Sequence, residues 1–169
     1  MFALLSFLIF FLSSILQLTI IPRLFGLTGV LPNLVLVLVI LWSVFFGFKK
    51  SFWLAIFVGF LLDLFSGSFF GTYIILFLLI AFIADLATEY IFRNNLLLSS
   101  LTLSIIFTII INFLLNYLSF KVLFSGYKLF YIFGLTIFFN LLLTISLFPL
   151  INMFKNKIAL YQKKEKLPY

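Results

Sequence analysis

Residues 2–21 read FALLSFLIFFLSSILQLTII, a run of 20 positions without a single charged side chain. A helix of about 20 apolar residues spans the roughly 30 Å hydrocarbon core of a bilayer. The run is longer than the apolar region of a signal peptide, has no basic residues before it and ends without a small-x-small cleavage site. We therefore expect a retained transmembrane helix that stops at Pro22 and Arg23.

The composition of the whole chain extends this prediction beyond the first segment. Of the 169 residues, 66% are hydrophobic and 9% are charged, whereas soluble domains have roughly 45–50% and 25%. Water could not keep such a surface in solution, and the same numbers exclude an intrinsically disordered chain. Lipid is therefore the expected solvent.

The missing residue types exclude most catalytic and metal chemistry. The chain has no cysteine, no histidine and four acidic residues. Disulfides, thiolate nucleophiles, histidine-dependent triads and carboxylate-rich metal cages are not expected, so we predict no cofactor, no metal and no enzymatic activity. The net charge of +7 comes from basic residues beside apolar segments, which fits membrane lipid headgroups rather than nucleic acid.

Turn residues and charges divide residues 1–154 into about six helices. The expected ranges are 2–21, 32–47, 52–65, 70–92, 96–120 and 129–154. The predicted fold class is all-α, a polytopic transmembrane helical bundle, with residues 155–169 as a short basic cytoplasmic tail. The third helix, about 14 residues long, is short for a full span, and four passes would remain if it formed a re-entrant pair with the fourth.

Basic residues are distributed unevenly over the expected loops. Eight lie on the side of the tail and three on the other side. The eight are Lys49, Lys50, Arg93, Lys155, Lys157, Lys163, Lys164 and Lys166, and the three are Arg23, Lys121 and Lys128. The positive-inside rule therefore predicts that both termini are cytoplasmic, with six passes or with four.

Asp63 is the polar residue that most needs a partner, since a carboxylate in hydrocarbon is costly. It belongs to the pattern Gly59-x3-Asp63-x3-Gly67-x3-Gly71, between the expected third and fourth helices. Its side chain could accept hydrogen bonds from the free N–H groups where the fourth helix begins, a place that also favours an anion. The alternatives are direct contact with a partner or ligand and, with less support, a proton relay.

Asp85, Glu89 and Arg93 follow at a spacing of four on the fourth helix. The order of glutamate before arginine favours an i,i+4 ion pair that anchors the helix at the interface. Alternatively, Asp85 makes a polar contact inside the bundle, because Ala81 and Ala84 on much the same face permit close packing.

Polar side chains recur every four residues on the last two expected helices. One stripe is Ser100, Ser104, Thr108, Asn112 and Asn116, and the other is Thr136, Asn140 and Thr144. Stripes of this kind join neighbouring helices through hydrogen bonds. The alternative is that they line a polar cavity.

Three motifs occur in a characteristic order in the first half of the chain. They are Leu16-Gln17-Leu18-Thr19, Gly29-x2-Pro32-Asn33-Leu34 and the glycine–aspartate pattern of residues 59–71. Together with length and hydropathy, they resemble the rod shape-determining membrane protein family MreD over about residues 1–92. Asn33 departs from the family, which often has aspartate there. The candidate partner-binding or structural positions are Gln17, Pro32, Asn33, Gly59, Asp63, Gly67, Gly71 and Asp85.

The resemblance implies a function that the residues alone do not. Family members are non-catalytic proteins of the bacterial inner membrane that bind MreC. They help couple MreB filaments to the glycosyltransferase RodA and its penicillin-binding transpeptidase partner in peptidoglycan synthesis. Their fold is similar to the membrane-embedded substrate-binding subunit of energy-coupling-factor vitamin transporters.

Three functions are therefore compared. A scaffold that binds partner helices would use the motif residues to shape a docking surface. A substrate-binding transport subunit would need a cavity lined by groups that orient a vitamin-sized ligand. An intramembrane enzyme would need its few carboxylates to converge, although Asp63 is expected near one face and Asp85 and Glu89 near the other.

Overall fold

The computed structural model describes residues 2–25, 30–66, 69–92, 95–118 and 126–165. Every regular element within these ranges is an α-helix. The helices are α1 (Phe2–Phe25), α2 (Leu34–Phe46), α3 (Phe48–Ser66), α4 (Thr72–Tyr90), α5 (Leu96–Leu118) and α6 (Gly126–Glu165). The predicted all-α membrane bundle is confirmed.

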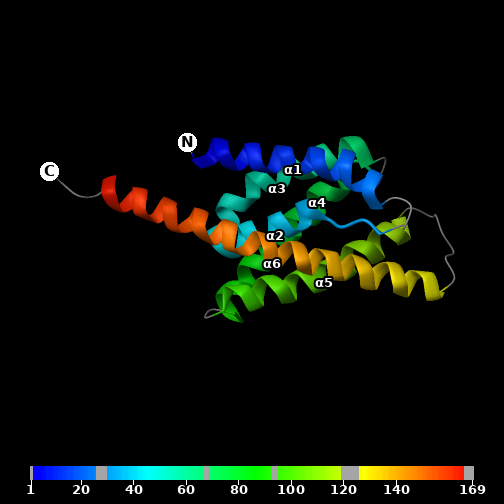
Figure 1. Cartoon of the computed structure of the whole chain (residues 1–169). Coiled ribbons are helices and arrows are strands. Elements are labelled where there is room, and N and C mark those ends of the chain that lie inside the picture. Colours follow the sequence, from blue (N-terminus) through cyan, green and yellow to red (C-terminus); the bar gives the residue numbers. More distant parts are fainter. Residues whose placement is uncertain (1, 26–29, 67–68, 93–94, 119–125, 166–169) are drawn as a thin grey trace.

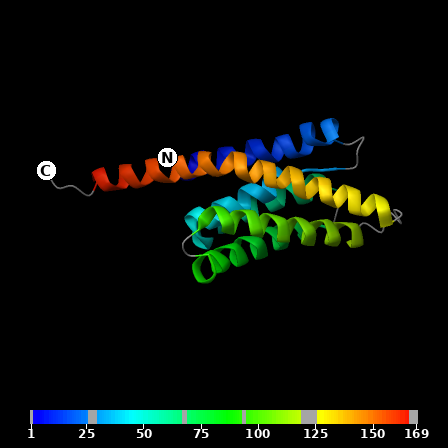
Figure 2. The same ribbon diagram turned by 60° about the horizontal axis from the view of Figure 1, so that its bottom comes forward.

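Successive helices run in opposite directions along one long axis (Figures 1 and 2). The start of α1 and the end of α6 lie at the same end of the molecule, which we call the terminal end; the starts of α2 and α4 lie at the opposite end (Figure 1). Four helices have segments long and apolar enough to cross a membrane. These are Leu4–Phe25, Thr72–Tyr90, Leu96–Leu114 and Phe130–Lys157. The chain is therefore a multi-pass membrane protein.

Helix α2 lies at the centre of the bundle and contacts each of the other five helices. All of its residues from Val35 to Phe45 are buried. It is only 13 residues long, about 20 Å at 1.5 Å per residue, and the extended residues 30–33 precede it. Non-helical backbone at membrane depth is tolerated only where protein surrounds it, and the central position of α2 provides that surrounding.

The short helix was expected in the wrong place. Helix α3 begins at Phe48 and has 19 residues, so Lys49 and Lys50 belong to its first turn instead of a loop. The reversal between α2 and α3 takes the single residue Gly47, whose φ of 81° suits glycine. Because the turn uses only Gly47, the two lysines that follow it are part of α3.

Two other helices exceed their expected ranges. Helix α1 continues through Pro22 to Phe25, so Pro22 does not end it. Helix α6 passes residue 154, the predicted boundary between bundle and tail, and continues to Glu165. Its 40 residues correspond to about 60 Å, twice the thickness of the hydrocarbon core.

Candidate functional site

Asp63 joins the end of α3 to the beginning of α4. Its carboxylate is buried, with 4% of its surface exposed. Oδ2 accepts hydrogen bonds from the backbone N–H groups of Gly71 at 3.0 Å and Ile74 at 3.2 Å, and Oδ1 accepts one from Tyr73 at 2.9 Å. The first N–H groups of a helix lack hydrogen-bond acceptors within the helix. Asp63, on the preceding helix, provides the acceptor oxygens for these groups of α4. These are the hydrogen bonds that the capping interpretation of Asp63 predicted.

Gly59 brings the backbones of α3 and α4 together one helical turn before Asp63. A Cβ atom at this position would lie 2.6 Å from the Cα of Ile74, closer than two non-bonded carbon atoms can approach. Only glycine therefore permits this crossing. The close approach also brings the start of α4 within reach of the Asp63 side chain.

Gly71 completes the connection between the two helices. Its φ of 95° lies in the left-handed region, and it precedes the first residue of α4. Glycine has no side chain that could cap the helix, so the cap comes from Asp63. Gly67, the remaining glycine of the pattern, lies outside the described residues.

A second polar cluster holds the beginning of α2. The Gln17 side chain of α1 donates to the carbonyl of Pro32 at 3.0 Å and accepts from the N–H of Leu34 at 2.7 Å. Asn33 caps the helix by accepting from the N–H of Leu36 at 2.9 Å. Asparagine is among the most favourable N-cap residues, about equal to aspartate.

Asn140 of α6 connects the same cluster to the other half of the bundle. Its Oδ1 accepts from the N–H of Asn33 at 2.8 Å, and its amide donates to the Thr108 hydroxyl of α5 at 2.8 Å. The side chain is fully buried. Sequence reasoning placed Asn140 in a polar stripe but did not connect it to Asn33, because a contact between residues 107 positions apart leaves no local pattern.

The polar stripes of α5 and α6 face one another. Thr144 donates to the hydroxyl of Ser104 at 3.1 Å, one turn from the contact between Thr108 and Asn140. All four side chains are buried. These hydrogen bonds favour the interpretation that the stripes join the two helices. The side chain of Asn116 lies outside the described residues.

Asp85 lies at the terminal end of the bundle and is half-buried. Its Oδ1 is 3.5 Å from the place where a Cβ on Gly47 would be. On the same face of α4, Ala81 and Ala84 are fully buried, and the hydroxyl of Ser43 donates to the carbonyl of Ala81. This face therefore packs against α2. Arg93 is outside the described residues, so the predicted ion pair with Glu89 is untested.

The carboxylates do not converge on a common reaction centre. Asp63 caps the start of α4, whereas Asp85 lies 11 residues after Ile74 on the same helix, roughly 16 Å further along at 1.5 Å per residue. No group of three acidic or other potential metal-ligating side chains occurs in the part of the chain that the structure describes. Within the described ranges, the clustered polar groups hydrogen-bond to one another and to the backbone and so hold helices together.

The two clusters contain most of the motif residues. Gln17, Pro32 and Asn33 surround the start of α2, while Gly59, Asp63 and Gly71 surround the start of α4. A model of the family "rod shape-determining protein MreD" matches residues 1–158. The chain belongs to the MreD family. The match extends over α5 and much of α6, which the sequence motifs did not cover.

Membership in the MreD family gives the chain a role in determining the shape of rod-shaped bacteria. The family is one of structural membrane proteins, in agreement with the apolar helices of this bundle. No curated protein and no solved structure matches the chain significantly.

Proposed function

We propose that the chain is a non-catalytic scaffold of the bacterial inner membrane that binds an MreC-like protein and helps organise peptidoglycan synthesis during cell elongation. Through that partner it would be linked indirectly to MreB, RodA and a penicillin-binding transpeptidase. The proposal rests on family membership and on one structural observation, the fixed hairpin of α3 and α4.

Two motif residues of this hairpin are inaccessible to a partner. Gly59 and Asp63 are both buried. Around them lies an exposed apolar surface, which we call the hairpin patch. It consists of Phe60, Leu64, Phe65, Phe69 and Phe70, with exposed fractions of 43–70%. The rings of Phe60 and Phe70 are in contact across the hairpin, with centroids 5.9 Å apart. The buried motif fixes the geometry of the patch, and the patch is what a partner helix would contact.

The alternative of a substrate-binding transport subunit has less support. Such a subunit needs polar groups that face a ligand. Here the buried groups that would serve best, Thr108, Asn140 and Thr144, bond to protein partners. The polar groups that a vitamin-sized ligand would need are therefore already hydrogen-bonded between and within helices.

Co-purification in mild detergent tests the proposal. The tagged chain from a rod-shaped bacterium should bring down an MreC-like protein in comparable amounts. The double variant Phe65→Ala/Phe69→Ala should recover at least about tenfold less partner, because truncating a central aromatic contact costs over 1 kcal/mol.

The matched control removes two exposed aromatic rings elsewhere, Phe113 (65% exposed) and Phe130 (82% exposed). Phe113→Ala/Phe130→Ala should keep the partner. Recovery of the unsubstituted chain alone would contradict the scaffold role, and equal loss of partner in both double variants would contradict the assignment of the patch.

A further inference from the structure

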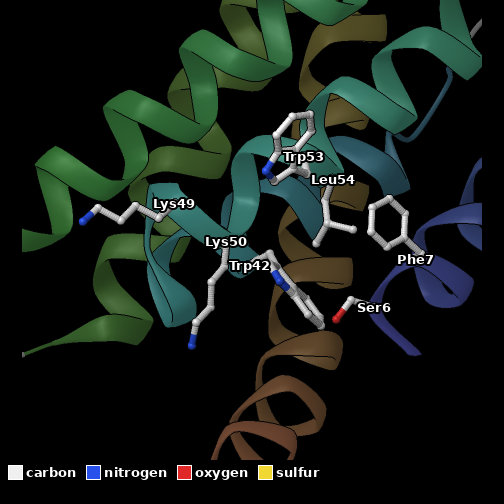
Figure 3. A pocket seen from close by; sticks show the side chains of 7 residues that line it. All are labelled: Ser6, Phe7, Trp42, Lys49, Lys50, Trp53 and Leu54. Carbon is white, nitrogen blue, oxygen red and sulfur yellow. The ribbon is translucent and has the colours of Figure 1, made fainter. Parts of the chain in front are cut away.

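A cavity of about 350 Å³ opens between α1, the end of α2 and the first turns of α3. Its walls include Phe7, Trp42, Trp53 and Leu54 (Figure 3). Trp42 is almost fully buried and forms the floor, whereas Trp53 is 66% exposed at the rim. The cavity therefore has an apolar interior that is accessible from the outer surface of the bundle. We call it the tryptophan groove.

Two lysines stand at the edge of the groove. Lys49 and Lys50 line it and are both exposed, and Figure 3 shows their side chains extending away from the rings of Trp42 and Phe7. Lysine side chains at the ends of membrane helices place their stems along apolar surface and their ammonium groups at the headgroups. The groove is thus apolar at depth and cationic at the interface.

The surrounding charges have the same sign. Lys155 lies at the same end, with its ammonium group 5.4 Å from the centroid of the Phe45 ring, and Lys157 follows on α6. Among the residues whose side chains the structure describes, the acidic ones at this end are Asp85, half-buried against Gly47, and the exposed Glu89. Within the same set, Lys49, Lys50, Lys155 and Lys157 outnumber these carboxylates by four to two, so the local field favours an anion.

We infer that the tryptophan groove binds one anionic phospholipid, with an acyl chain against Phe7 and Trp53, above the buried Trp42, and the phosphate near Lys49 and Lys50. The volume lies within the roughly 300–1,000 Å³ range of small-molecule sites. Basic pockets between helices at a membrane surface bind anionic headgroups, and the apolar floor distinguishes a phospholipid from a free phosphate. The site is separate from the hairpin patch, which lies at the opposite end of α3.

The chain contains its own reporter for this site. Trp42 and Trp53 are its two tryptophans, and both line the groove. In a Trp53→Phe background, Trp42 is the single tryptophan, and its 1% exposure shields it from bulk lipid. Acyl chains brominated near the middle quench tryptophan fluorescence at short range, so stronger quenching of Trp42 by one lipid than by another reports enrichment of that lipid beside the groove.

The experiment uses the full-length Trp53→Phe chain in phosphatidylcholine vesicles with increasing fractions of brominated lipid. Brominated phosphatidylglycerol should quench Trp42 at a much lower fraction than brominated phosphatidylcholine does. Lys49→Gln/Lys50→Gln should raise the half-quenching fraction of phosphatidylglycerol about fivefold for each lysine removed. Lys155→Gln/Lys157→Gln should weaken the preference less than Lys49→Gln/Lys50→Gln does, since these residues add to the field but do not line the groove.

The comparison of the two lipids in the Trp53→Phe chain, with both lysines present, already tests the proposal. Equal quenching by the two brominated lipids would overturn the assignment, as would competition by inorganic phosphate at the same concentration as the lipid phosphate. A preference that persists in Lys49→Gln/Lys50→Gln would overturn the role of these lysines. Because both are exposed surface residues, their substitution should leave the fold intact, which a size-exclusion profile checks.

Discussion

Asp63 is a buried carboxylate whose hydrogen bonds all point toward the next helix. Three backbone N–H groups of residues 71–74 donate to it, and the positive end of the α4 dipole adds to their attraction. A group with this environment stabilises the hairpin more than an ordinary surface cap does, because loss of the carboxylate leaves several buried donors without an acceptor.

Asp63→Ala should therefore lower the free energy of unfolding by about 2 kcal/mol or more, given 0.5–2 kcal/mol for an ordinary N-cap and 1.5–3 kcal/mol for a hydrogen bond to a charged group. The measurement is an SDS titration of the purified chain. The exposed Glu89 provides the control, since Glu89→Ala should change little. Equal stability of the two variants would contradict the capping role.

Gly59→Ala should destabilise the chain through steric overlap. The added carbon would lie 2.6 Å from the Cα of Ile74, so α3 and α4 must separate, and overpacking of this kind costs about 1–3 kcal/mol. The same titration measures the effect.

Gly134 is the matched control because a Cβ there meets nothing within 4 Å. Gly134→Ala should be neutral or stabilising by up to about 1 kcal/mol, the difference in helix propensity. If Gly59→Ala were as stable as Gly134→Ala, the close approach would not matter.

At this scale, sequence reasoning was informative wherever a residue acts on its chain neighbours. The spacing of Asp63 before Gly71 predicted a cap at the start of the fourth helix, and the structure has those hydrogen bonds. It did not find Gln17 bonding to residues 32 and 34, or Asn140 bonding to Asn33. The type and spacing of these residues show that they need partners, while the fold alone decides which partners they obtain.

The helices α2 and α4 share one structural device. Each begins with N–H groups that a side chain of the preceding helix satisfies, Gln17 of α1 for α2 and Asp63 of α3 for α4. At α2 the side chain must satisfy a carbonyl group as well as an N–H group, because residues 30–33 are extended and their carbonyls have no helical partners. Backbone groups without partners in a membrane cost several kcal/mol each.

Gln17→Leu should therefore destabilise α2 although it replaces a polar residue by an apolar one in a membrane helix. The Pro32 carbonyl and the Leu34 N–H would each lose a partner, at about 1–3 kcal/mol each. Thermal melting of the detergent-solubilised chain should show a lower midpoint.

Thr19→Ala is the control on the same helix. The Thr19 hydroxyl is exposed and donates only to the Ile15 carbonyl of its own helix, so its loss should hardly move the midpoint. If Gln17→Leu raised the midpoint, hydropathy would dominate and the proposed role of the polar cluster would be wrong.

The lengths of α2 and α3 show where hydropathy reasoning fails for elements. Lys49 and Lys50 suggested a loop and hence a short third helix, but they occupy the first turn of α3. The 13-residue helix is α2, the most apolar segment, whose central position removes the need to span the bilayer by itself. The composition and the spacing of apolar segments predict how many helices form and that they are apolar. Where each helix ends depends on which residue forms the turn, which is Gly47 between α2 and α3.

At the scale of the whole molecule, the start of α1 and the end of α6 lie at one end (Figure 1). The positive-inside rule predicts that this end is cytoplasmic, and the absence of native cysteine makes single-cysteine labelling clean. In spheroplasts, an impermeant maleimide should label Arg23→Cys and leave Lys49→Cys and Lys157→Cys unlabelled until the membrane is opened.

Labelling of Lys157→Cys from outside would reverse the predicted orientation. Labelling of Lys49→Cys and Lys157→Cys from different sides would contradict the arrangement of the bundle itself. The three positions are exposed in the structure, so access by the reagent reports on the compartment.

The proposed function requires the bundle to act on cell shape by presenting the hairpin patch to a partner. The most direct measurement is the length-to-width ratio of rod-shaped cells whose own gene for this protein is replaced by a variant, at matched membrane levels. Phe65→Ala/Phe69→Ala should give rounded cells and Phe113→Ala/Phe130→Ala should give normal rods. Normal rods with the patch variant, or equal rounding with both variants, would contradict the claim.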